Sequence, residues 1–225
     1  FEGGIKTTLF DRQLRFNVGA YRYSYRDLQV DFFNSPIFAF QTLTADARTQ
    51  GIEVEVEYAP NTIEGLNFRG SINYNKARYT SFGDAPCYSG QSQAEGCNLT
   101  LDGGVYRPLT PAEVTGGVNG SRQNLNGKPL SVAPRWTGNF GVGYETPVGN
   151  GLRVGMNVDA RFSGSYLASA FGNPNSRQKN YTTLDAGLRV GAEDGNWEVA
   201  LIGKNLTNKF YVSGVVDGPS TGGTN

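Results

Sequence analysis

The side chains that most often carry out catalysis or bind metals are scarce in this sequence. Histidine is absent from the 225 residues, which removes the commonest general base and the commonest transition-metal ligand. Two cysteines, Cys87 and Cys97, cannot complete a four-ligand zinc site without histidine. Asp84, Glu95 and Asp102 surround them, but their spacing matches no calcium-binding loop. We therefore expect a protein that is not an enzyme and has no catalytic residue, metal site or cofactor.

The two cysteines lie in a short polar stretch, PCYSGQSQAEGC, that is rich in Gly and Ser. Because such a stretch is no buried core, a local disulfide between Cys87 and Cys97 is favoured over a pair of free thiols in a mobile loop. A disulfide there indicates an oxidising compartment. It would stabilise the fold by about 2 to 3 kcal/mol, mainly by restricting the unfolded chain.

Aromatic side chains offer the other candidate chemistry. They cluster where a strand near the start of the chain enters a long link, and they comprise Tyr21, Tyr23, Tyr25, Phe32, Phe33, Phe38 and Phe40. Aromatic rings bring large contact area and can stack on sugar rings or catecholates. The alternative is ordinary packing of rings at the end of a strand. The residues that we take as candidate ligand contacts are Tyr21, Tyr23, Tyr25, Phe32 and Phe33.

The bulk composition limits the class of partner and the class of fold. The 20 basic residues balance the 20 acidic ones, so nucleic acid is not expected as a partner. The 31 glycines are about twice the usual share of ~7%, which suits strands and turns rather than helices. No stretch approaches the ~18 to 20 consecutive apolar residues that a membrane-spanning helix needs. Helical membrane proteins are therefore excluded.

Hydrophobic residues recur with a period of two. Between Leu152 and Ser163 every even position is apolar, and the odd positions are charged, polar or glycine. On a helix these apolar groups would scatter around the circumference, whereas a strand places them all on one side. The pattern predicts a strand with one apolar face and one polar face.

The same alternation predicts eight strands and an all-β fold. The predicted strands cover residues 3–9, 14–25, 51–58, 66–75, 136–145, 152–163, 181–192 and 197–206. Tight turns rich in Asp, Asn, Gly and Pro alternate with long links at about 29–48, 82–135 and 165–180. Short and long connections in alternation describe an antiparallel up-and-down sheet with all long loops at one end. The 82–135 link is long enough to be a binding loop.

Two solvents could explain such two-faced strands. In a soluble barrel or sandwich the apolar face packs a core, whereas in an outer-membrane barrel it meets lipid. Three observations favour lipid: apolar stripes of about 9 to 11 residues, aromatic residues near strand ends, and the alternation of short turns with long loops. The polar face carries Glu53, Glu55 and Glu57, and Arg69 on the next strand could oppose one of them. Such charges would either line a solute path or plug-docking surface, or form structural ion pairs in a barrel wall.

Several segments resemble one protein family. The run GKNLTNKFY at 203–211 is similar to the near-terminal strand of TonB-dependent outer-membrane receptors. Earlier strands of the barrel resemble LRFNVGAYRYSYRDLQV, RTQGIEVEVEYAP and APRWTGNFGVGYE, and PCYSGQSQAEGC looks like the outer-loop cysteine pair of some members. The resemblance implies a 22-stranded barrel, a plug domain and a TonB box, together with a bacterial outer-membrane location. It also implies a ligand such as a metal-siderophore, a cobalamin or a carbohydrate.

The resemblance identifies residues 1–225 as a C-terminal part of such a barrel, with the plug domain and the closing strand outside the sequence. The expected partners are outer-membrane lipid, the TonB complex through the missing N-terminal part, and the small-molecule ligand. Two alternatives stay open. The chain could be a complete eight-stranded outer-membrane barrel with an adhesin or porin-like role, which requires its first and last strands to pair. It could also be a secreted carbohydrate-binding β-sandwich, in which Val154 and Val158 would be buried.

Overall fold

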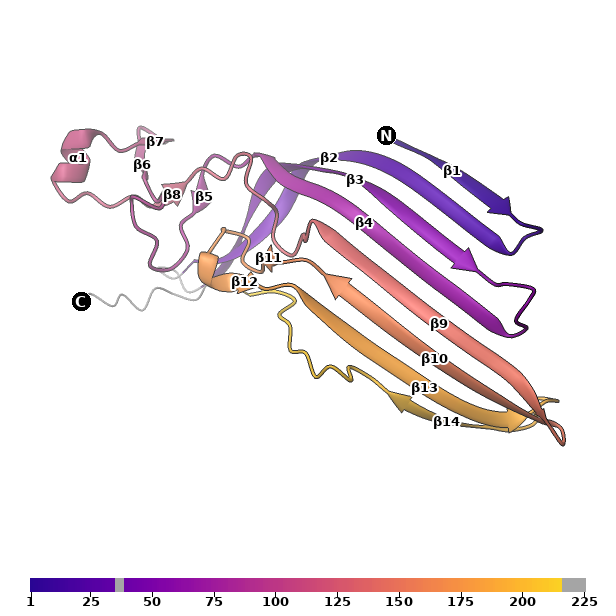
Figure 1. Cartoon of the computed structure of the whole chain (residues 1–225). Coiled ribbons are helices and arrows are strands. Elements are labelled where there is room, and N and C mark those ends of the chain that lie inside the picture. Colours follow the sequence, from indigo (N-terminus) through magenta and orange to yellow (C-terminus); the bar gives the residue numbers. More distant parts are fainter. Residues whose placement is uncertain (35–38, 216–225) are drawn as a thin grey trace.

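One antiparallel sheet of eight strands dominates the computed structural model, which describes residues 1–34 and 39–215 (Figure 1). Its order follows the chain, so the predicted up-and-down topology is confirmed. The strands are β1 (Glu2–Leu9), β2 (Leu14–Asn34), β3 (Ala39–Tyr58), β4 (Leu66–Ser81), β9 (Trp136–Gly149), β10 (Leu152–Ser163), β13 (Tyr181–Ala192) and β14 (Glu198–Gly203).

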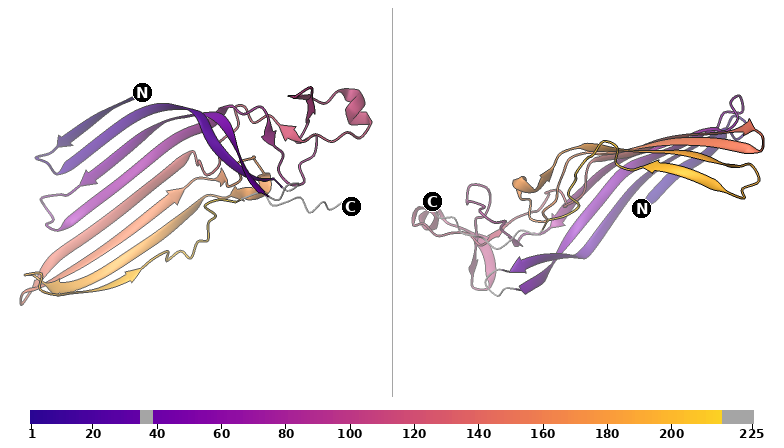
Figure 2. Two further views of the ribbon diagram at one scale, coloured as in Figure 1. Left: turned by 180° about the vertical axis from the view of Figure 1, so that it is seen from behind. Right: turned by 90° about the horizontal axis from the view of Figure 1, so that it is seen from below.

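The predicted 82–135 link is not an unstructured loop. It carries a second sheet of four short strands in the order β5-β8-β6-β7, and a short helix. A two-stranded ribbon and a 3₁₀ turn follow β10. The bounds of these elements are β5 (Ala85–Pro86), β6 (Leu99–Asp102), β7 (Val105–Pro108), α1 (Pro111–Thr115), β8 (Arg122–Gln123), β11 (Tyr166–Leu167), η2 (Pro174–Ser176) and β12 (Arg177–Gln178). All of them lie at one end of the large sheet (Figures 1 and 2).

The long link predicted at 29–48 is wrong, because β2 and β3 continue through it as one hairpin. A register shift lies between Tyr25 and Leu28, and Asp27 has a left-handed backbone (φ 55°). Two residues of β2, Arg26 and Asp27, stand against the single residue Asp46 of β3. The one extra residue forms a β-bulge, which changes which positions of β2 face each side of the sheet. Val30 and Phe32 consequently bury on the face that carries Tyr25. The bulge interrupts the alternation of apolar and polar residues, and for this reason the sequence pattern predicts that the strand ends at Tyr25.

The other predicted strands differ little from the structure. Strands β10 and β13 have the predicted bounds, β4 and β9 extend beyond them, and β14 is shorter. Trp197, which was expected near a strand end, falls just before β14. The period of two is thus reliable within strands, whereas strand ends depend on pairing with neighbours.

The large sheet has one apolar and one polar face. Large apolar side chains on the apolar face are about half exposed, among them Ile52, Ile72, Phe140, Met156 and Leu188. Register places them in continuous cross-strand rows, such as Val18, Val54 and Ile72. The opposite, polar face carries Glu53, Glu55, Glu57 and Asp159. A sheet whose apolar side chains stay exposed is typical of a membrane barrel wall rather than of a folded core.

These faces and edges eliminate the two alternatives. Strands β1 and β14 are the opposite edges of the sheet and do not pair, so the eight strands do not close into a small barrel (Figure 1). Val158 is exposed and Val154 is only partly covered, which contradicts a sandwich in which both are buried. No helix in the described part of the chain is long and apolar enough to span a membrane.

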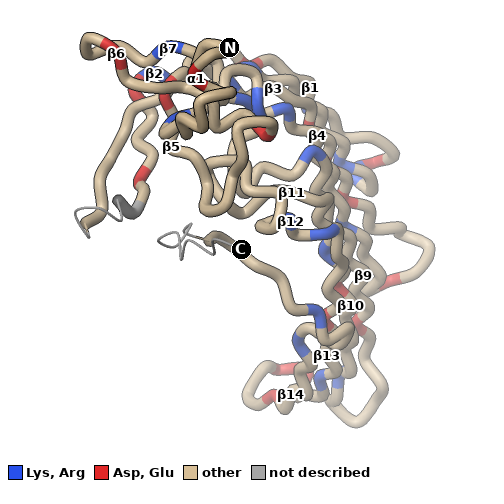
Figure 3. Tube along the Cα trace, turned by 90° about the vertical axis from the view of Figure 1, so that its left-hand side faces the viewer, with Lys and Arg blue, Asp and Glu red and all other residues tan. Residues whose placement is uncertain are grey.

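The buried core lies at the loop end and not under the sheet. It joins Val30, Ala45 and Tyr79 of the large sheet to Phe82, Leu125 and Phe171 of the loops. Tyr79, Ala47 and Ala77 lie on the polar face and are buried there. Viewed from the loop end, the sheet forms an arc with the loop segments gathered on one side (Figure 3). The loops therefore fold over the polar face, which is the inner face of the wall.

Candidate functional site

The three predicted tyrosines of β2 lie in line on the polar face. The rings of Tyr21 and Tyr23 stack, with centroids 5.6 Å apart and planes at 22°. The Tyr21 hydroxyl donates to Oδ1 of Asn73 at 3.2 Å, and the Tyr23 hydroxyl donates to Oε2 of Glu2 at 2.5 Å. Tyr23 and Tyr25 are exposed. The structure thus places Tyr21, Tyr23 and Tyr25 in one row on the polar face of β2.

Phe32 shares this face but has a different environment. Its ring packs edge-on against Phe171, with centroids 6.1 Å apart, and only 6% of the residue is exposed. Phe32 therefore anchors the loops and presents no free ring to a ligand. The side chain of Phe33 and the whole of Phe38 lie outside the described residues, and Phe40 is exposed.

A hollow of about 780 Å³ lies on the polar face near the loop end, over β9, β10 and β13. Its aromatic wall is formed by Tyr166, Tyr181 and Tyr211. The rings of Tyr181 and Tyr211 stack with centroids 4.5 Å apart and planes at 5°, and the Tyr166 hydroxyl donates to the Val212 carbonyl at 2.5 Å. Sequence reasoning missed these residues as a site. The signal was present in the inward register of Tyr181 and in the terminal Tyr of GKNLTNKFY, but only folding brings residues 166, 181 and 211 together.

The same hollow is lined by charged residues of both signs. Arg69, Arg161, Asp159 and Asp185 all border it. Arg69 forms an ion pair with Asp159, two strands away, and not with the glutamates of β3. Glu57 does lie opposite Arg69 in register, but it binds Arg15 on its other side at 2.8 Å. The expectation that Arg69 opposes a glutamate is therefore confirmed in register, whereas the ion pair goes elsewhere.

A glycine explains this choice of partner. Gly141 of β9 lies between Arg69 of β4 and Asp159 of β10 in one cross-strand row. A Cβ at Gly141 would lie 2.6 Å from Oδ1 of Asp159 and 2.7 Å from Nε of Arg69. Without that Cβ, the two side chains meet over the intervening strand. Glycine on the polar face thus allows charges on alternate strands to pair.

The arrangement recurs toward the turn end of the sheet. Glu145 and Arg189 approach to 4.0 Å across Gly155, and Arg153 and Glu198 approach to 3.5 Å across Gly191. Arg153 also binds Glu145 at 3.2 Å. Because these groups are partly exposed, each pair contributes little stability. Together they give the polar face a hydrated, mixed-charge surface.

The loops that cover this face are cross-linked. Cys87 and Cys97 form a disulfide, which confirms the favoured pairing. Gln123 is buried, and its Nε2 donates to the carbonyls of Pro86 at 2.8 Å and Phe171 at 2.9 Å. Gln123 thereby links the 82–135 and 164–180 loops to each other at the loop end of the sheet.

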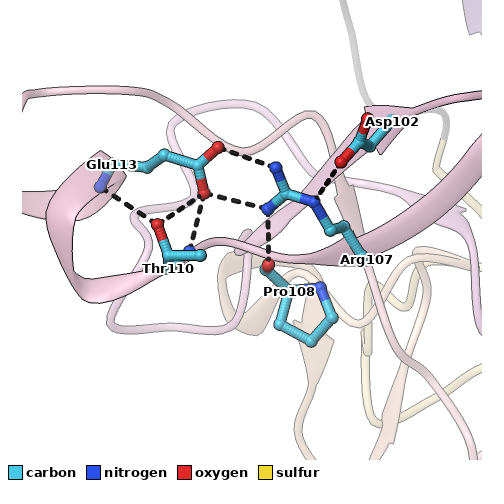
Figure 4. A network of polar contacts seen from close by, with 5 residues as sticks. All are labelled: Asp102, Arg107, Pro108, Thr110 and Glu113. Atoms are coloured by element: carbon cyan, nitrogen blue, oxygen red, sulfur yellow. Dashed lines mark hydrogen bonds and ion pairs between the residues drawn. The ribbon is translucent and has the colours of Figure 1, made fainter.

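Arg107 joins β6, β7 and α1 in the loop sheet, which is the four-stranded sheet of the 82–135 segment (Figure 4). Its Nε donates to Asp102 at 2.6 Å, and Nη1 and Nη2 each donate to Glu113 at 2.9 Å. Glu113 also accepts from the backbone N–H of Thr110 at 2.7 Å and forms a capping box with it at the start of α1. These bonds, that to Arg107 first, lower the pKa of Glu113 from 4.5 to about 2. Asp102 and Glu113 thus both accept hydrogen bonds within this segment.

The sequence of residues 1–206 matches the family described as TonB dependent receptor-like, beta-barrel. Comparison with curated protein sequences gave no match. Among solved structures, the siderophore receptor PiuA from Acinetobacter baumannii is similar, with 15% identity, a TM-score of 0.58, and coverage of 96% of this chain and 25% of its own.

Two further receptors have the same fold. The ferric-catecholate import receptor Fiu from E. coli K12 has 17% identity, a TM-score of 0.55, and coverage of 96% of this chain and 24% of its own. The pyoverdine outer membrane receptor FpvA from Pseudomonas aeruginosa PAO1 has 16% identity, a TM-score of 0.50, and coverage of 96% and 26%.

The likeness to these structures concerns the fold, and this chain spans about a quarter of their length. The family match extends over nearly the whole chain, through all eight strands of the large sheet. It agrees with the exposed apolar face, the polar inner face and the long loops gathered at one end. The chain therefore belongs to the TonB-dependent receptor family, as part of its β-barrel.

Proposed function

We propose that this chain forms part of the wall of an outer-membrane receptor that takes up a ferric siderophore at the expense of energy delivered by TonB. The observation that carries the proposal is the polar inner face, which is hollowed under cross-linked loops while the apolar face stays exposed. Cobalamin and carbohydrate are the other ligand classes expected from the sequence. The three similar receptors named above are described as siderophore, ferric-catecholate and pyoverdine receptors, which favours iron.

Binding would use the inner face and the loops. The stacked pair Tyr181 and Tyr211 offers flat aromatic contact, and Arg161 beside it offers a cation for an anionic iron chelate. The tyrosines of β2 form a second aromatic surface on the same face. Hydrogen bonding and stacking of this kind hold a solute and release it without covalent chemistry. We infer a role in binding and passage and not in catalysis.

Other parts of the proposed receptor lie outside this chain. Residues 1–225 would supply a C-terminal part of the barrel, with the plug domain and the closing strand supplied elsewhere in the protein. TonB would act through the N-terminal part of the receptor, which contains the plug domain. The half-exposed side chains of the apolar face would contact outer-membrane lipid.

The test is uptake by cells that carry the full-length protein in place of their own receptors. Cells would be offered ⁵⁵Fe-labelled siderophores, radiolabelled cobalamin and a maltooligosaccharide in parallel. We expect energy-dependent accumulation of iron only. Tyr211→Ala should weaken uptake, because it removes half of the stacked pair. Phe210→Ala is the matched control, since Phe210 is 87% exposed and does not line the hollow.

The proposal has clear failing outcomes. Accumulation that persists after the membrane is de-energised would contradict the TonB-coupled mechanism. Uptake of cobalamin or sugar in place of iron would reassign the ligand. Recovery of the protein from the aqueous fraction without detergent would contradict its place in the outer membrane.

A further inference from the structure

Four cations gather on the apolar face of the sheet at its loop end. They are Arg22 of β2, Arg48 of β3, and Lys76 and Arg78 of β4. Register places Arg22, Gln50 and Lys76 in one cross-strand row, and Arg48 directly opposite Arg78 in the next. Successive residues of a strand point to opposite faces of the sheet, and the residues next to these cations lie on the polar face. The four cations therefore point away from the lumen.

The cluster begins where the apolar band ends. The neighbouring row toward the turns is Ala20, Ile52 and Tyr74, roughly 7 Å along the strands. Tyr74 packs against Trp136 with ring centroids 4.9 Å apart, and such aromatic pairs mark the boundary between hydrocarbon and headgroups. A barrel that buries this apolar band in lipid therefore holds the four cations at headgroup level, in the leaflet on the loop side.

Carboxylates of the described residues do not neutralise these cations. None of the four forms an ion pair within residues 1–34 and 39–215. Arg78 donates to the Gly127 carbonyl at 3.0 Å, and Nε of Arg48 is buried without a hydrogen-bond partner. The carboxylate of Asp46 accepts instead from the backbone N–H of Asp27 at 3.2 Å.

This arrangement contrasts with the polar face of the same sheet. There, Arg15, Arg69, Arg153 and Arg189 each approach a carboxylate. Like charges placed directly opposite on neighbouring strands are destabilising, and an unpaired buried guanidinium nitrogen adds the cost of desolvation. An external anion beside Arg48 and Arg78 would remove the repulsion between these two opposed cations.

A groove of about 610 Å³ lies among these residues. It is lined by Arg48, Gln50, Lys76, Arg78, Thr80 and Gly127, among others. Guanidinium groups bind phosphate oxygens through paired N–H donors, and the ammonium of Lys adds a mobile charge. The groove thus offers hydrogen-bond donors and positive charge at the level where a lipid carries its phosphates.

We propose that this groove binds the phosphate groups of a phosphorylated lipid headgroup in the leaflet on the loop side. The proposal rests on the membrane placement in the proposed function, but it concerns the outside of the barrel and not the solute path. The lipid phosphates bridge Arg48 and Arg78, and Lys76 and Arg22 contact the same headgroup from the adjoining row. The occupant is a lipid, because its acyl chains would lie along the exposed apolar rows directly below.

The test is lipid retention by the purified full-length protein in detergent, measured by native mass spectrometry. The probes are bisphosphorylated lipid A, the same lipid after removal of its phosphates, and inorganic phosphate as a competitor. The double variant Arg48→Gln/Lys76→Gln removes two cations of the groove. The matched control is Lys6→Gln/Lys204→Gln, which removes two exposed cations elsewhere. Folding of each variant is verified by its resistance to SDS before heating.

We expect the groove variant to bind the bisphosphorylated lipid about 30-fold more weakly, as the loss of two headgroup-level cations implies. The control variant should bind as the natural protein does. Equal retention by the two double variants would overturn the proposal, and so would equal binding of the dephosphorylated lipid. Displacement of the lipid by inorganic phosphate at equal concentration would show a free-anion site instead. Failure of iron uptake with lipid binding intact would count against the proposed function alone.

Discussion

Gly51→Ala is the smallest change that we expect to damage the barrel wall. Gly51 lies on the polar face of β3, opposite Tyr21 on one side and Asn75 on the other. A Cβ at this position would lie 2.0 Å from the carbonyl oxygen of Tyr74 and 2.6 Å from the Tyr21 hydroxyl. The ring of Tyr21 can move away, but the Tyr74 carbonyl belongs to the β4 backbone and cannot. The added methyl group must therefore push β3 and β4 apart.

The cost follows from two contributions. Overpacking in a tightly packed region costs about 1 to 3 kcal/mol. Displacing Tyr21 also removes its hydrogen bond to Asn73, which is worth about 0.5 to 1.5 kcal/mol. We expect Gly51→Ala to reduce the free energy of unfolding by about 1.5 to 4.5 kcal/mol. The stacked Tyr21 and Tyr23 would separate at the same time.

The measurement is unfolding by urea in detergent, followed by the gel mobility difference between folded and unfolded barrel. Gly19→Ala is the matched control, since Gly19 lies mid-strand on the same face of β2. Its added Cβ would be 3.6 Å from the nearest atom, Cγ of Glu53, which is ordinary contact. We expect Gly19→Ala to keep the stability of the natural protein.

A second variant separates the two contributions. Tyr21→Ala added to Gly51→Ala relieves the contact with the tyrosine but leaves the contact with the Tyr74 carbonyl. The double variant should stay at least as unstable as Gly51→Ala. If Gly51→Ala proves as stable as Gly19→Ala, or if the double variant recovers full stability, the close approach of β3 and β4 at this point is wrong.

Three further changes test the loops and the polar face. The ion pair with Arg107 lowers the pKa of Glu113 from 4.5 to about 2. The charged form of Glu113 therefore stabilises the loop above pH 4.5, and this stabilisation is lost as the pH falls through about 2. Pepsin cleavage within α1 should rise over that pH interval, and Glu113→Gln should remove this pH dependence. Replacing Cys87 and Cys97 by serine should destabilise the loop sheet by about 2 to 3 kcal/mol, seen as faster proteolysis between the two positions with the sheet strands intact. Asp159→Asn should cost no more than about 1 kcal/mol of unfolding free energy, because the pair with Arg69 is partly exposed; a larger loss would show that the pair acts as a buried one.

The sequence alone determined the strands and their two faces. Alternation between Leu152 and Ser163 fixed both the bounds of β10 and the side on which its apolar residues lie, because side-chain direction in a strand follows from backbone geometry. The cysteine pair and the short turns were likewise predictable from local composition. Family membership followed from the order of such local patterns along the chain.

Local patterns could not predict features that depend on pairing between distant residues. The hairpin of β2 and β3 was missed because the bulge between Tyr25 and Leu28 interrupts the alternation. Folding over the polar face turned Phe32 from an expected ligand contact into part of the loop core. The aromatic hollow joins residues 166, 181 and 211, which no spacing rule connects.

The partners of the charged residues were also decided in three dimensions. Arg69 has Glu57 beside it in register but pairs with Asp159, because Gly141 leaves open space over the strand between them. Arg48 and Arg78 read as ordinary polar residues in the sequence, and only the register places them opposite each other beyond the apolar band. A sequence sets which side of a strand each residue occupies. The tertiary structure sets which charges meet, because contact depends on the register of neighbouring strands and on the space that their side chains leave.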